Sequence, residues 1–404
     1  MFENQEKHDI KICLNMIVKN ESHVITKCLN SLEHIIDAVA IADTGSSDNT
    51  VDIIEKWIKE KKLIGGVTNN EWTNFGENRT QALRYAESIV EKLDGTWYIL
   101  FMDADDYVVG NDGKSKMSFD KTAINPDIRM YYLSMKCGSL TYDRTWMIKY
   151  EKSFKWKWFH PLHEYIGPED GKTLEPQYLG KIKSGYILAT REGARSQDPM
   201  KYMKDALTLE LAKKNKYQKD KNSKLDPRDT FYLAQSYRDS GIPHLLKNAE
   251  KLYSERIKLG GWPEEIYIAM VEAGKCRERR GKSDFKALEY YLKAYELRPH
   301  RLEAPHFIVR WFRSHKCYKA GYTFGKPLIN TPFPENDKLF VNAEIHNWRF
   351  LDEVAVCAYY SGDKNTCNDL CHRILKQNTH LDNINKKRIL KNIKFCSNNV
   401  DNTK

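Results

Sequence analysis

The chain of 404 residues carries a formal net charge of +10, with 41% hydrophobic and 30% charged residues. This balance is that of an ordinary globular protein of two to three domains, long enough to bury a core in each. No run approaches eighteen consecutive apolar residues, and the polar N-terminus lacks an apolar signal region. Neither a transmembrane helix nor a secretory leader is therefore expected.

The cysteines favour a cytoplasmic location. Their number, nine, is odd, and they follow no framework of spacings, which predicts reduced thiols. Cys367, Cys371 and His372, with Cys357 nearby, form the one local cluster that suggests zinc. Its spacing fits no standard zinc finger, and the same positions suit a buried helix face, so zinc is not favoured.

The charge is unevenly distributed. Residues 1–198 contain 26 Lys and Arg against 30 Asp and Glu, a net of −4, whereas residues 199–404 contain 39 against 25, a net of +14. We therefore expect two functional halves, with domains at 1–198 and 199–396 and a disordered tail at 397–404. The basic half either faces an acidic partner or membrane surface or has a lysine-rich solvated exterior. Nucleic acid is not expected as a partner, because no nucleic-acid-binding fold accompanies the charge.

The N-terminal half alternates strand and helix patterns. Residues 11–18 form a nearly continuous apolar run, typical of a strand buried on both faces, and residues 22–34 carry apolar side chains at helical spacing. A second apolar strand at 36–42 and another helix at 50–62 follow. This order predicts a parallel α/β sheet, in which ligands sit at the carboxyl ends of the strands.

Polar side chains follow the second strand and open the next helix. Asp43 ends a buried strand, where only a ligand or a local hydrogen bond favours a charge, and Asp48 suits the cap of the following helix. Arg79, near the start of a helix over 77–92, is placed to bind a phosphate bidentately. An ion pair of Arg79 with Glu77 or another acid is the simpler alternative.

An apolar run at 99–102 ends in three carboxylates, Asp103, Asp105 and Asp106. Acids at the carboxyl end of a buried strand are suited to hold a hard divalent cation together with the phosphates of a substrate. An acidic turn is the simpler interpretation of so short a motif. The motifs upstream favour the cation site.

Four segments occur in an order that is typical of a known family. Residues 17–21 read Ile-Val-Lys-Asn-Glu, residues 43–50 Asp-Thr-Gly-Ser-Ser-Asp-Asn-Thr, residues 75–79 Phe-Gly-Glu-Asn-Arg and residues 103–106 Asp-Ala-Asp-Asp. Together they resemble family 2 glycosyltransferases, over about residues 10–195. The resemblance implies the GT-A fold, a nucleotide-binding α/β sheet merged with an acceptor-binding part.

The resemblance also implies which residues serve the donor. The residues implied for nucleotide-sugar binding are Val18, Asn20, Glu21, Asp43, Asn78, Arg79, Asp103 and Ala104. The metal, Mn²⁺ or Mg²⁺, is held by Asp105 as the more direct ligand and by Asp103, which also lies nearer the ribose. Many relatives read Ala-Arg-Asn where this chain reads Glu77-Asn78-Arg79, which leaves the exact phosphate contacts open.

The catalytic base is expected in the segment 156–165, Trp-Lys-Trp-Phe-His-Pro-Leu-His-Glu-Tyr. Its aromatic side chains supply flat apolar faces for a sugar ring, and an inverting transfer needs a general base that deprotonates the acceptor. Glu164 is the predicted base, with His163 as second candidate or further metal ligand, and a buried aromatic cluster is the alternative. Arg195, in the segment 191–196, is expected on a mobile loop that closes over the diphosphate, unless this segment is only an interdomain linker.

From about residue 199 the strand patterns give way to long amphipathic helices. They are predicted at 229–241, 243–259, 263–281, 284–297 and, more loosely, 343–361 and 363–378. The starts at Asp229, Pro263 and Pro299 lie 34 and 36 residues apart, close to the tetratricopeptide period. Such repeats stack into a solenoid with a concave binding surface. The fold class expected for the whole chain is α/β followed by all-α.

Arginines cluster in this helical half. They are Arg277, Arg279, Arg280, Arg298, Arg301, Arg310 and Arg313. They suit an acidic peptide, a glycan or a phosphate-bearing acceptor, and the alternative is a solvated face with ion pairs along the helices.

The sequence thus predicts a metal-dependent glycosyltransferase that moves a sugar from UDP-glucose or UDP-N-acetylglucosamine to a glycan or protein acceptor, with inversion. The choice of UDP rests on the family resemblance. A repeat scaffold with a nucleotide-binding but inactive front half is the alternative. A nucleotidyltransferase is disfavoured, because residues 19–22, Lys-Asn-Glu-Ser, are not the glycine-rich phosphate loop that such enzymes place after the first strand.

Overall fold

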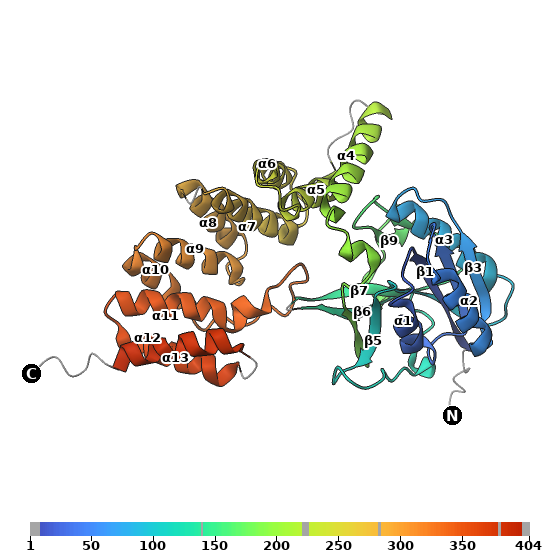
Figure 1. Ribbon diagram of the computed structural model, residues 1–404, viewed down its shortest axis with the longest axis horizontal. Coiled ribbons are helices and arrows are strands. Elements are labelled where there is room, and N and C mark those ends of the chain that lie inside the picture. Colours follow the sequence, from blue (N-terminus) through green and yellow to red (C-terminus); the bar gives the residue numbers. More distant parts are fainter. Residues whose placement is uncertain (1–8, 139, 220–225, 282–283, 379–380, 398–404) are drawn as a thin grey trace, which may run out of the picture. The chain divides into compact units, whose positions relative to one another are not determined.

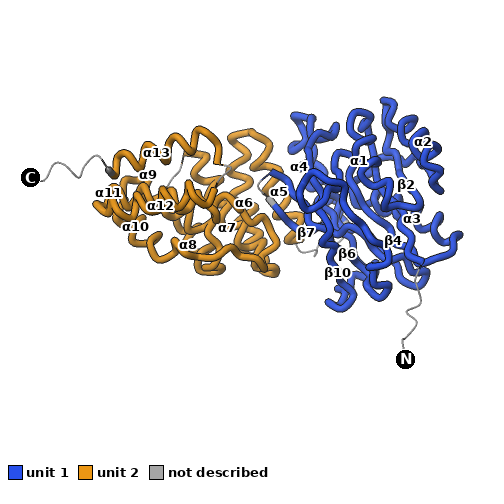
Figure 2. Tube along the Cα trace, turned by 90° about the horizontal axis from the view of Figure 1, so that it is seen from below, with its two compact units in different colours: residues 1–223 blue, residues 224–404 orange. Residues whose placement is uncertain are grey.

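The computed structural model describes residues 9–138, 140–219, 226–281, 284–378 and 381–397. The chain divides into two compact units, residues 1–223 and 224–404 (Figure 2). Within the described ranges the first is built on a sheet and the second on helices, so the predicted fold class is confirmed. The predicted boundary at residue 198 falls before helix α4 (Lys201–Lys219), which belongs to the first unit. The predicted tail lies, from residue 398 onward, outside the described residues.

The first unit contains a mixed sheet with the strand order β3-β2-β1-β4-β7-β6-β11-β5 and with β10 beside β6 (Figure 1). Its strands are β1 (Ile10–Val18), β2 (Ala38–Asp43), β3 (Ile64–Asn69), β4 (Thr96–Phe101), β5 (Asp106–Gly110), β6 (Met130–Cys137), β7 (Leu140–Lys149), β10 (Leu179–Lys181) and β11 (Gly185–Ala189). A separate hairpin pairs β8 (Trp156–Phe159) with β9 (Tyr165–Pro168).

Strands β1 to β4 form the parallel part of the sheet that the sequence predicts. β1 pairs in parallel with β2 and β4, and β2 pairs in parallel with β3. Most side chains of β1 and all of β2 are buried, which explains their continuous apolar runs. β3 is an edge strand with exposed positions and two glycines. It lacks an apolar run for that reason, and the sequence prediction omits it.

The other part of the sheet is mixed, which the sequence patterns did not reveal: β10 and β11 pair in parallel with β6, and the remaining pairs are antiparallel. β7 pairs antiparallel with β4 and β6, and β11 pairs antiparallel with β5. Because β5 begins at Asp106, β11 ends beside the acid segment, with Ala189 opposite Asp106. β7 carries Arg144, whose guanidinium reaches Asp103. The antiparallel strands thus bring distant parts of the sequence to the carboxyl end of β4.

Helices α1 (Ile25–Leu32), α2 (Thr50–Lys61) and α3 (Phe75–Val90) cover the parallel strands, close to the ranges predicted for them. Apolar side chains of α1 and α2 share a core with one face of β1, including Ile12 and Leu14. α3 and the tryptophans of β8 share the core of the opposite face with Cys13, as the two-residue period of a strand requires. The start of α3 therefore lies against the β8–β9 loop, where Phe75 N donates to Pro161 O at 3.1 Å.

The second unit is a succession of helices (Figure 1). In the described ranges these are α5 (Pro227–Asp239), α6 (Leu245–Lys258), α7 (Pro263–Arg279), α8 (Phe285–Leu297), α9 (Glu303–Ser314), α10 (Tyr318–Gly325), α11 (Phe350–Tyr360), α12 (Lys364–Gln377) and α13 (Asn383–Ser397), with a π-helical turn at Ile345–Arg349. Each helix packs against the next, as expected of stacked repeats. The predicted helices are present, whereas α10 and α13 were not predicted.

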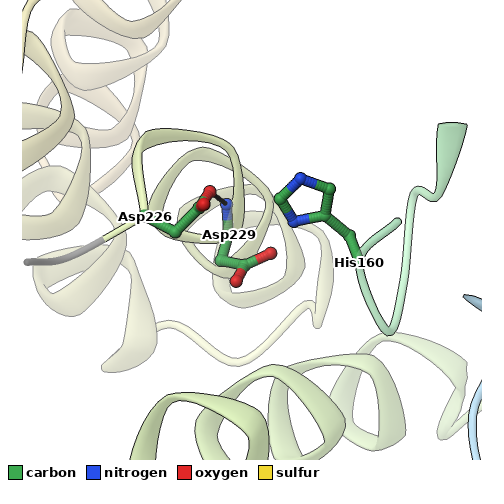
Figure 3. Close-up of side chains that lie close together, drawn as sticks. All are labelled: His160, Asp226 and Asp229. Carbon is green, nitrogen blue, oxygen red and sulfur yellow. Dashed lines mark hydrogen bonds between the residues drawn. The ribbon is translucent and has the colours of Figure 1, made fainter. Parts of the chain in front are cut away.

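The start of α5 shows how a local signal places a helix. Pro227 occupies the first turn, and the carboxylate of Asp226 accepts from the backbone N–H groups of Arg228 at 2.9 Å and Asp229 at 3.1 Å, the second of which is drawn in Figure 3. The cap is therefore Asp226, and the predicted start, Asp229, lies inside the first turn. An acid followed by proline is a strong helix start because the acid satisfies orphan N–H groups and proline has none to satisfy.

Most of the clustered arginines are paired with acids inside the second unit. Arg301 is fully buried and pairs with Glu303 at 2.7 Å, and Arg277 pairs with Glu250 at 3.0 Å and Asp284 at 2.6 Å. Further pairs are Arg280–Glu250, Arg298–Asp337, Arg310–Glu278 and Arg313–Glu353. The ion-pair alternative therefore describes six of the seven arginines. Many of these pairs, however, join different helices and do not lie along one solvent-exposed helix face.

The cysteines predicted as a possible zinc cluster lie on a buried helix face. All nine cysteines of the chain are free thiols, and Cys357, Cys367 and Cys371 are buried on α11 and α12. In the part of the chain that the structure describes, they form no group of three convergent ligand atoms. The buried helix face that the sequence offered as alternative accounts for these positions. A search of the described helices for one long and apolar enough to cross a membrane found none.

Candidate active site

The carboxyl ends of β1, β2 and β4 meet at one edge of the sheet and bring predicted site residues together. In the β1–β2 pair Val18 lies opposite Asp43, and β4 ends at Phe101, just before the acid segment. Three of the predicted site residues are buried at this edge of the sheet: Val18, Asp43 and Ala104. Ligands of parallel α/β sheets bind at such an edge.

Local hydrogen bonds join the ends of β1 and β2. Asp43 accepts from the backbone N–H groups of Gly45 at 3.0 Å and Ser46 at 2.9 Å. Asn20 adopts a left-handed backbone conformation (φ 57°), and its side-chain oxygen accepts from Ser47 N at 2.7 Å. The local alternative therefore accounts for the buried charge of Asp43, and a contact of Asn20 or Asp43 with a nucleotide stays a prediction.

Asp103 lies between two arginines. Arg79 of α3 donates from Nη2 to its Oδ1, and Arg144 of β7 donates from Nη1 to its Oδ2 at 2.5 Å. Burial disfavours the charge of Asp103, but the charges of Arg144 and Arg79 outweigh it and hold the pKa of Asp103 well below its usual range. Asp103 is therefore an ionised carboxylate with both oxygens engaged by cations of the protein.

The other two acids of the segment are placed differently. Asp105 accepts through Oδ2 from Gly193 N at 3.1 Å. Asp106 is buried, and its Oδ2, which has no hydrogen-bond partner in the described part, lies 3.7 Å from Nη1 of Arg144. Burial, and next the charge of Asp103, raise the pKa of Asp106 to about 8. Among the described residues the three acids do not bring three ligand atoms within 4.8 Å of one another.

Arg79 links the acid segment to the predicted base. It is buried, and its Nε donates to Oε1 of Glu164 at 2.6 Å while its Nη2 reaches Asp103. The ring of Trp158 lies beside the guanidinium, with its centroid 5.2 Å from Cζ. The ion-pair alternative thus describes Arg79, and the acids are Asp103 and Glu164 rather than Glu77. A contact of Arg79 with phosphate requires that one of these bonds be exchanged.

Asn78, predicted at the nucleotide, is fully buried and holds the loop before α3. Its Oδ1 accepts from Thr73 N at 2.9 Å and Asn74 N at 3.2 Å, and its Nδ2 donates to Glu71 O at 2.8 Å. The side chain satisfies its polar atoms within this loop. Asn78 therefore fixes the chain just before Arg79. Its side chain is not exposed to solvent in this structure, and its contact with a nucleotide stays a prediction.

The predicted base lies in the loop 160–164 between β8 and β9. His160 (φ 70°) and His163 (φ 53°) both adopt the left-handed backbone conformation, which is uncommon for residues with a side chain and indicates a constrained loop. The loop packs on α3 so closely that a Cβ at Gly76 would lie 2.2 Å from the carbonyl oxygen of His160. This contact holds the side chain of Glu164, 11% exposed, beside α3.

The aromatic side chains of the hairpin divide into two groups. Trp156 and Trp158 are buried in the core between α3 and the sheet, as the buried-cluster alternative proposed. Phe159 and Tyr165 stack on each other at a centroid distance of 5.4 Å, and Tyr165 is 47% exposed. Only this second pair offers an accessible aromatic face near Glu164.

The loop that follows β11 is fastened to the acid segment. Thr190 Oγ1 donates to the backbone oxygen of Asp105 at 2.7 Å, Gly193 N donates to the Asp105 carboxylate, and Ala194 N donates to the carboxylate of Glu21 at 3.2 Å. Burial raises the pKa of Glu21 to about 7. The segment therefore packs against the acid segment and the end of β1, and its closure over a diphosphate stays a prediction.

Arg195, predicted at the diphosphate, is engaged elsewhere. Its Nη2 lies 2.5 Å from Oδ1 of Asp205 in α4, and its Cζ lies 4.7 Å from the ring centroid of Phe75. The side chain is 41% exposed, so it borders the site without filling it. Its contact with a diphosphate stays a prediction.

The chemistry of the acid segment suits a hard divalent cation, chiefly through Asp105. Both oxygens of Asp103 are already paired with guanidinium groups. The carboxylate of Asp105, in contrast, is only partly buried and accepts from a backbone N–H. Mg²⁺ and similar ions are commonly bound by one or two carboxylates and by substrate phosphates. Asp105 fits that form of binding better than Asp103 does.

Comparison with known proteins finds similarity over part of the chain that carries this site. Residues 13–112, which include the ends of β1, β2 and β4, match the family model for glycosyl transferase family 2, so the predicted resemblance is confirmed over that range. The SPbeta prophage-derived glycosyltransferase SunS of Bacillus subtilis (strain 168) and the glycosyltransferase SunS of Bacillus phage SPbeta are each 36% identical to the chain over 112 residues. These residues make up 27% of this chain and 24% of each relative, so the match spans about a quarter of the relatives' length.

Solved structures resemble the chain more weakly. BtubC from P. vanneervenii aligns with 51% of this chain and 84% of its own at 14% identity and a TM-score of 0.37. A tetratricopeptide repeat protein from Parabacteroides merdae aligns with 49% of this chain and 68% of its own at 12% identity and a TM-score of 0.37. Alignments at this level carry no functional information. The evidence for repeats in the second unit is the packing of its successive helices.

Sequence reasoning missed Arg144 and Thr190. Arg144 lies in an antiparallel strand, Leu140–Lys149, that belongs to none of the recognised motifs. The sequence shows only a charged residue in a strand-like segment. Such a residue is equally typical of a strand at the solvent-exposed edge of a sheet. Thr190 carried no signal, and the segment 191–196 was predicted as a loop without the contact of Gly193, because both contacts involve backbone groups that only the fold brings to Asp105.

Proposed function

We propose that the protein is a glycosyltransferase that moves a sugar from a nucleotide sugar to a glycan or protein acceptor with inversion. The observation that carries the proposal is the contact of Arg79 with both Asp103 and Glu164 at the carboxyl ends of the strands. It links a candidate base to the acid segment within a region that matches glycosyl transferase family 2. UDP-glucose and UDP-N-acetylglucosamine are the proposed donors, on the strength of the family resemblance.

The donor occupies the edge formed by Val18, Asn20, Glu21 and Asp43 in this proposal, with its diphosphate at the acid segment. Mn²⁺ or Mg²⁺, when bound at Asp105, supplies Lewis-acid stabilisation for the departing nucleoside diphosphate. The loop after β11 excludes water from that side, because Gly193 and Ala194 lie against Asp105 and Glu21. Exclusion of water favours transfer to the acceptor over hydrolysis.

Glu164 takes the proton of the acceptor hydroxyl or other nucleophile in this proposal. Its Oε1 is held by Arg79, so its Oε2 is the oxygen that receives the proton. The stacked Phe159 and Tyr165 offer the acceptor or the sugar an apolar face close to that carboxylate. His163, in the same loop, remains the second candidate for the base.

A panel of nucleotide sugars tests the proposal. With Mn²⁺ present, one donor should be hydrolysed slowly, seen as released nucleoside diphosphate, and the Asp105→Asn variant should lose this metal-dependent release. Asp52→Asn, which changes an exposed acid on α2, is the matched control and should keep it. If no nucleotide sugar is hydrolysed or raises the melting temperature, the proposal is wrong.

One observation favours a second candidate, a repeat scaffold whose front half binds a nucleotide without turnover. Arg79 and both oxygens of Asp103 are already satisfied by internal ion pairs, as in a purely structural network. The same panel of nucleotide sugars separates the two candidates. With a scaffold, a donor would raise the melting temperature, but no nucleoside diphosphate would be released with or without an acceptor.

A further inference from the structure

We infer that Arg144 is a positioning residue of the donor site: it fixes Asp103 and thereby, through Arg79, holds Glu164 in its working position. The inference rests on the proposed function, because Glu164 is the base only if the chain transfers sugar. Arg144 lies in the antiparallel part of the sheet, outside the matched residues 13–112 and outside every motif of the sequence.

The geometry is a row of alternating acidic and basic side chains. Glu164 meets Arg79 at 2.6 Å, Arg79 meets Asp103, Asp103 meets Arg144 at 2.5 Å, and Arg144 lies 3.7 Å from Asp106. The two end members are well buried, with side chains 11% and 4% exposed. Away from bulk water such contacts are strong and directional, so each group constrains the next.

Arg144 is the member that holds Oδ2 of Asp103 apart from Arg79. Asp103 and Asp106 begin and end one tight turn, in which Asp106 N donates to Asp103 O at 3.1 Å. Nη1 of Arg144 lies within 4 Å of a carboxylate oxygen of each. Without that cation, Oδ2 of Asp103 would lose its partner, and the carboxylate would be drawn wholly to Arg79.

A shift of Asp103 toward Arg79 changes the position of Glu164. The guanidinium of Arg79 divides its donors between the two acids, Nε to Glu164 and Nη2 to Asp103. If Asp103 takes a second donor, the guanidinium turns and the bond to Glu164 weakens. Misplacement of a catalytic group by about 1 Å can cost on the order of 100-fold in rate, although binding is kept.

The test is the kinetics of Arg144→Gln with the donor that the wild-type chain uses. We expect kcat to fall at least about tenfold, in line with that cost of misplacement. The donor KM and the Kd of the nucleoside diphosphate with Mn²⁺ should stay within about twofold, because in this inference Arg144 does not touch the donor. Arg144→Lys, which keeps the charge, should restore most of kcat.

A matched control removes an ion pair of similar geometry outside the site. Arg129 pairs with Glu151 at 2.8 Å, with side chains 30% and 24% exposed, next to the same antiparallel strands. Arg129→Gln should therefore leave kcat within about twofold of wild type. If Arg144→Gln does not fold, the double variant Arg144→Gln/Asp106→Asn carries the test. It removes the cation together with the buried carboxyl that faces it, so no buried acid is left without a partner, and it should show the same loss of kcat.

Three results would overturn the inference. The first is a kcat of Arg144→Gln, or of the double variant, within twofold of wild type. The second is a raised KM or Kd with kcat preserved, which makes Arg144 a donor-binding residue. The third is an equal loss of kcat in Arg129→Gln, which makes the effect a general one of the sheet. Failure of the proposed function is seen separately, as absence of turnover in the wild-type chain, and the inference falls with it.

Discussion

Single residues of the acid segment differ because their neighbours come from different elements. Asp103 meets arginines from α3 and β7, Asp105 meets the loop after β11, and Asp106 is buried at the start of β5. A carboxylate beside two guanidinium groups is stabilised in its charged form, whereas a buried carboxyl that lacks a close partner is not. Three aspartates within four positions of the sequence therefore have three distinct chemical environments.

At this scale the first prediction concerns Glu164. Glu164→Gln keeps the shape of the side chain and a bond from Arg79, but it cannot take a proton. We expect donor binding to be retained, measured as the melting-temperature shift with nucleoside diphosphate and Mn²⁺, and transfer to fall by about 10²- to 10⁴-fold. Glu169→Gln, which changes a half-exposed acid at the end of the same hairpin, should keep full activity. Transfer retained by Glu164→Gln would remove Glu164 as the base.

At the scale of elements, the site depends on close contacts between segments rather than on any one helix or strand. The start of α3 packs on the β8–β9 loop, and the loop after β11 packs on the end of β4. Both contacts need glycine. A Cβ at Gly76 would meet the backbone oxygen of His160, and a Cβ at Gly193 would meet the side chain of Asp105. These contacts, and not secondary-structure propensity, bring Arg79, Glu164 and Asp105 to one place.

The contact at Gly76 is tested by Gly76→Ala. The added methyl group would lie 2.2 Å from a backbone oxygen, which cannot move aside cheaply, so α3 and the hairpin must separate. We expect a loss of stability of about 1–3 kcal/mol, measured by chemical unfolding, and a parallel loss of turnover. At Gly66 on β3 the nearest atom is the Tyr85 hydroxyl at 3.5 Å, so Gly66→Ala should be tolerated. Equal stability of the two variants would contradict this account.

The contact at Gly193 is tested by Gly193→Ala. The added Cβ would lie 2.9 Å from Cγ of Asp105, so the loop must move away from the acid segment. We expect faster proteolysis within residues 190–197 and more hydrolysis relative to transfer, because water then reaches the donor. Glu192→Ala, which changes an exposed side chain and keeps the backbone contacts, should behave like wild type. Unchanged proteolysis of Gly193→Ala would show that the loop is not held by this contact.

At the scale of the whole molecule, the chain joins a sheet unit that carries the candidate site to a helical unit held by buried ion pairs and buried titratable groups. His306 of α9 is an example: it is 8% exposed, and its Nδ1 has no hydrogen-bond partner among the described residues. Burial, and next the charges of Arg310 and Arg349, lower its pKa to about 3. The second unit therefore folds around a neutral imidazole.

The last prediction follows from this lowered pKa. Below about pH 6.5 the unfolded chain binds a proton at His306 that the folded unit does not bind until about pH 3, so stability is lost as the pH falls through this range. The slope attributable to His306 is at most about 1.4 kcal/mol per pH unit. Thermal unfolding between pH 8 and pH 4 measures it. His306→Gln should flatten the slope, and His300→Gln, a half-exposed control, should not. An identical slope in both variants would contradict the prediction.

Local patterns in the sequence were sufficient for much of the fold. The strands at Ile10–Val18 and Ala38–Asp43 appear as apolar runs because both faces are buried, and α1 appears through its helical periodicity. The acid segment and Glu164 were found through their motifs. The placement of the acid segment follows from the parallel sheet, whereas that of Glu164 depends on the separate β8–β9 hairpin.

Only the tertiary structure decided how these residues are paired. Arg79 was expected at a phosphate and lies between Asp103 and Glu164, and Arg144 joins the same row from an antiparallel strand that no pattern predicted. The physical reason is that charge pairing depends on distance in space, whereas periodicity and motifs report only order along the chain. The sequence by itself determined the two-part architecture and the residue types at the candidate site, and the packing of distant strands and loops decided which charge meets which.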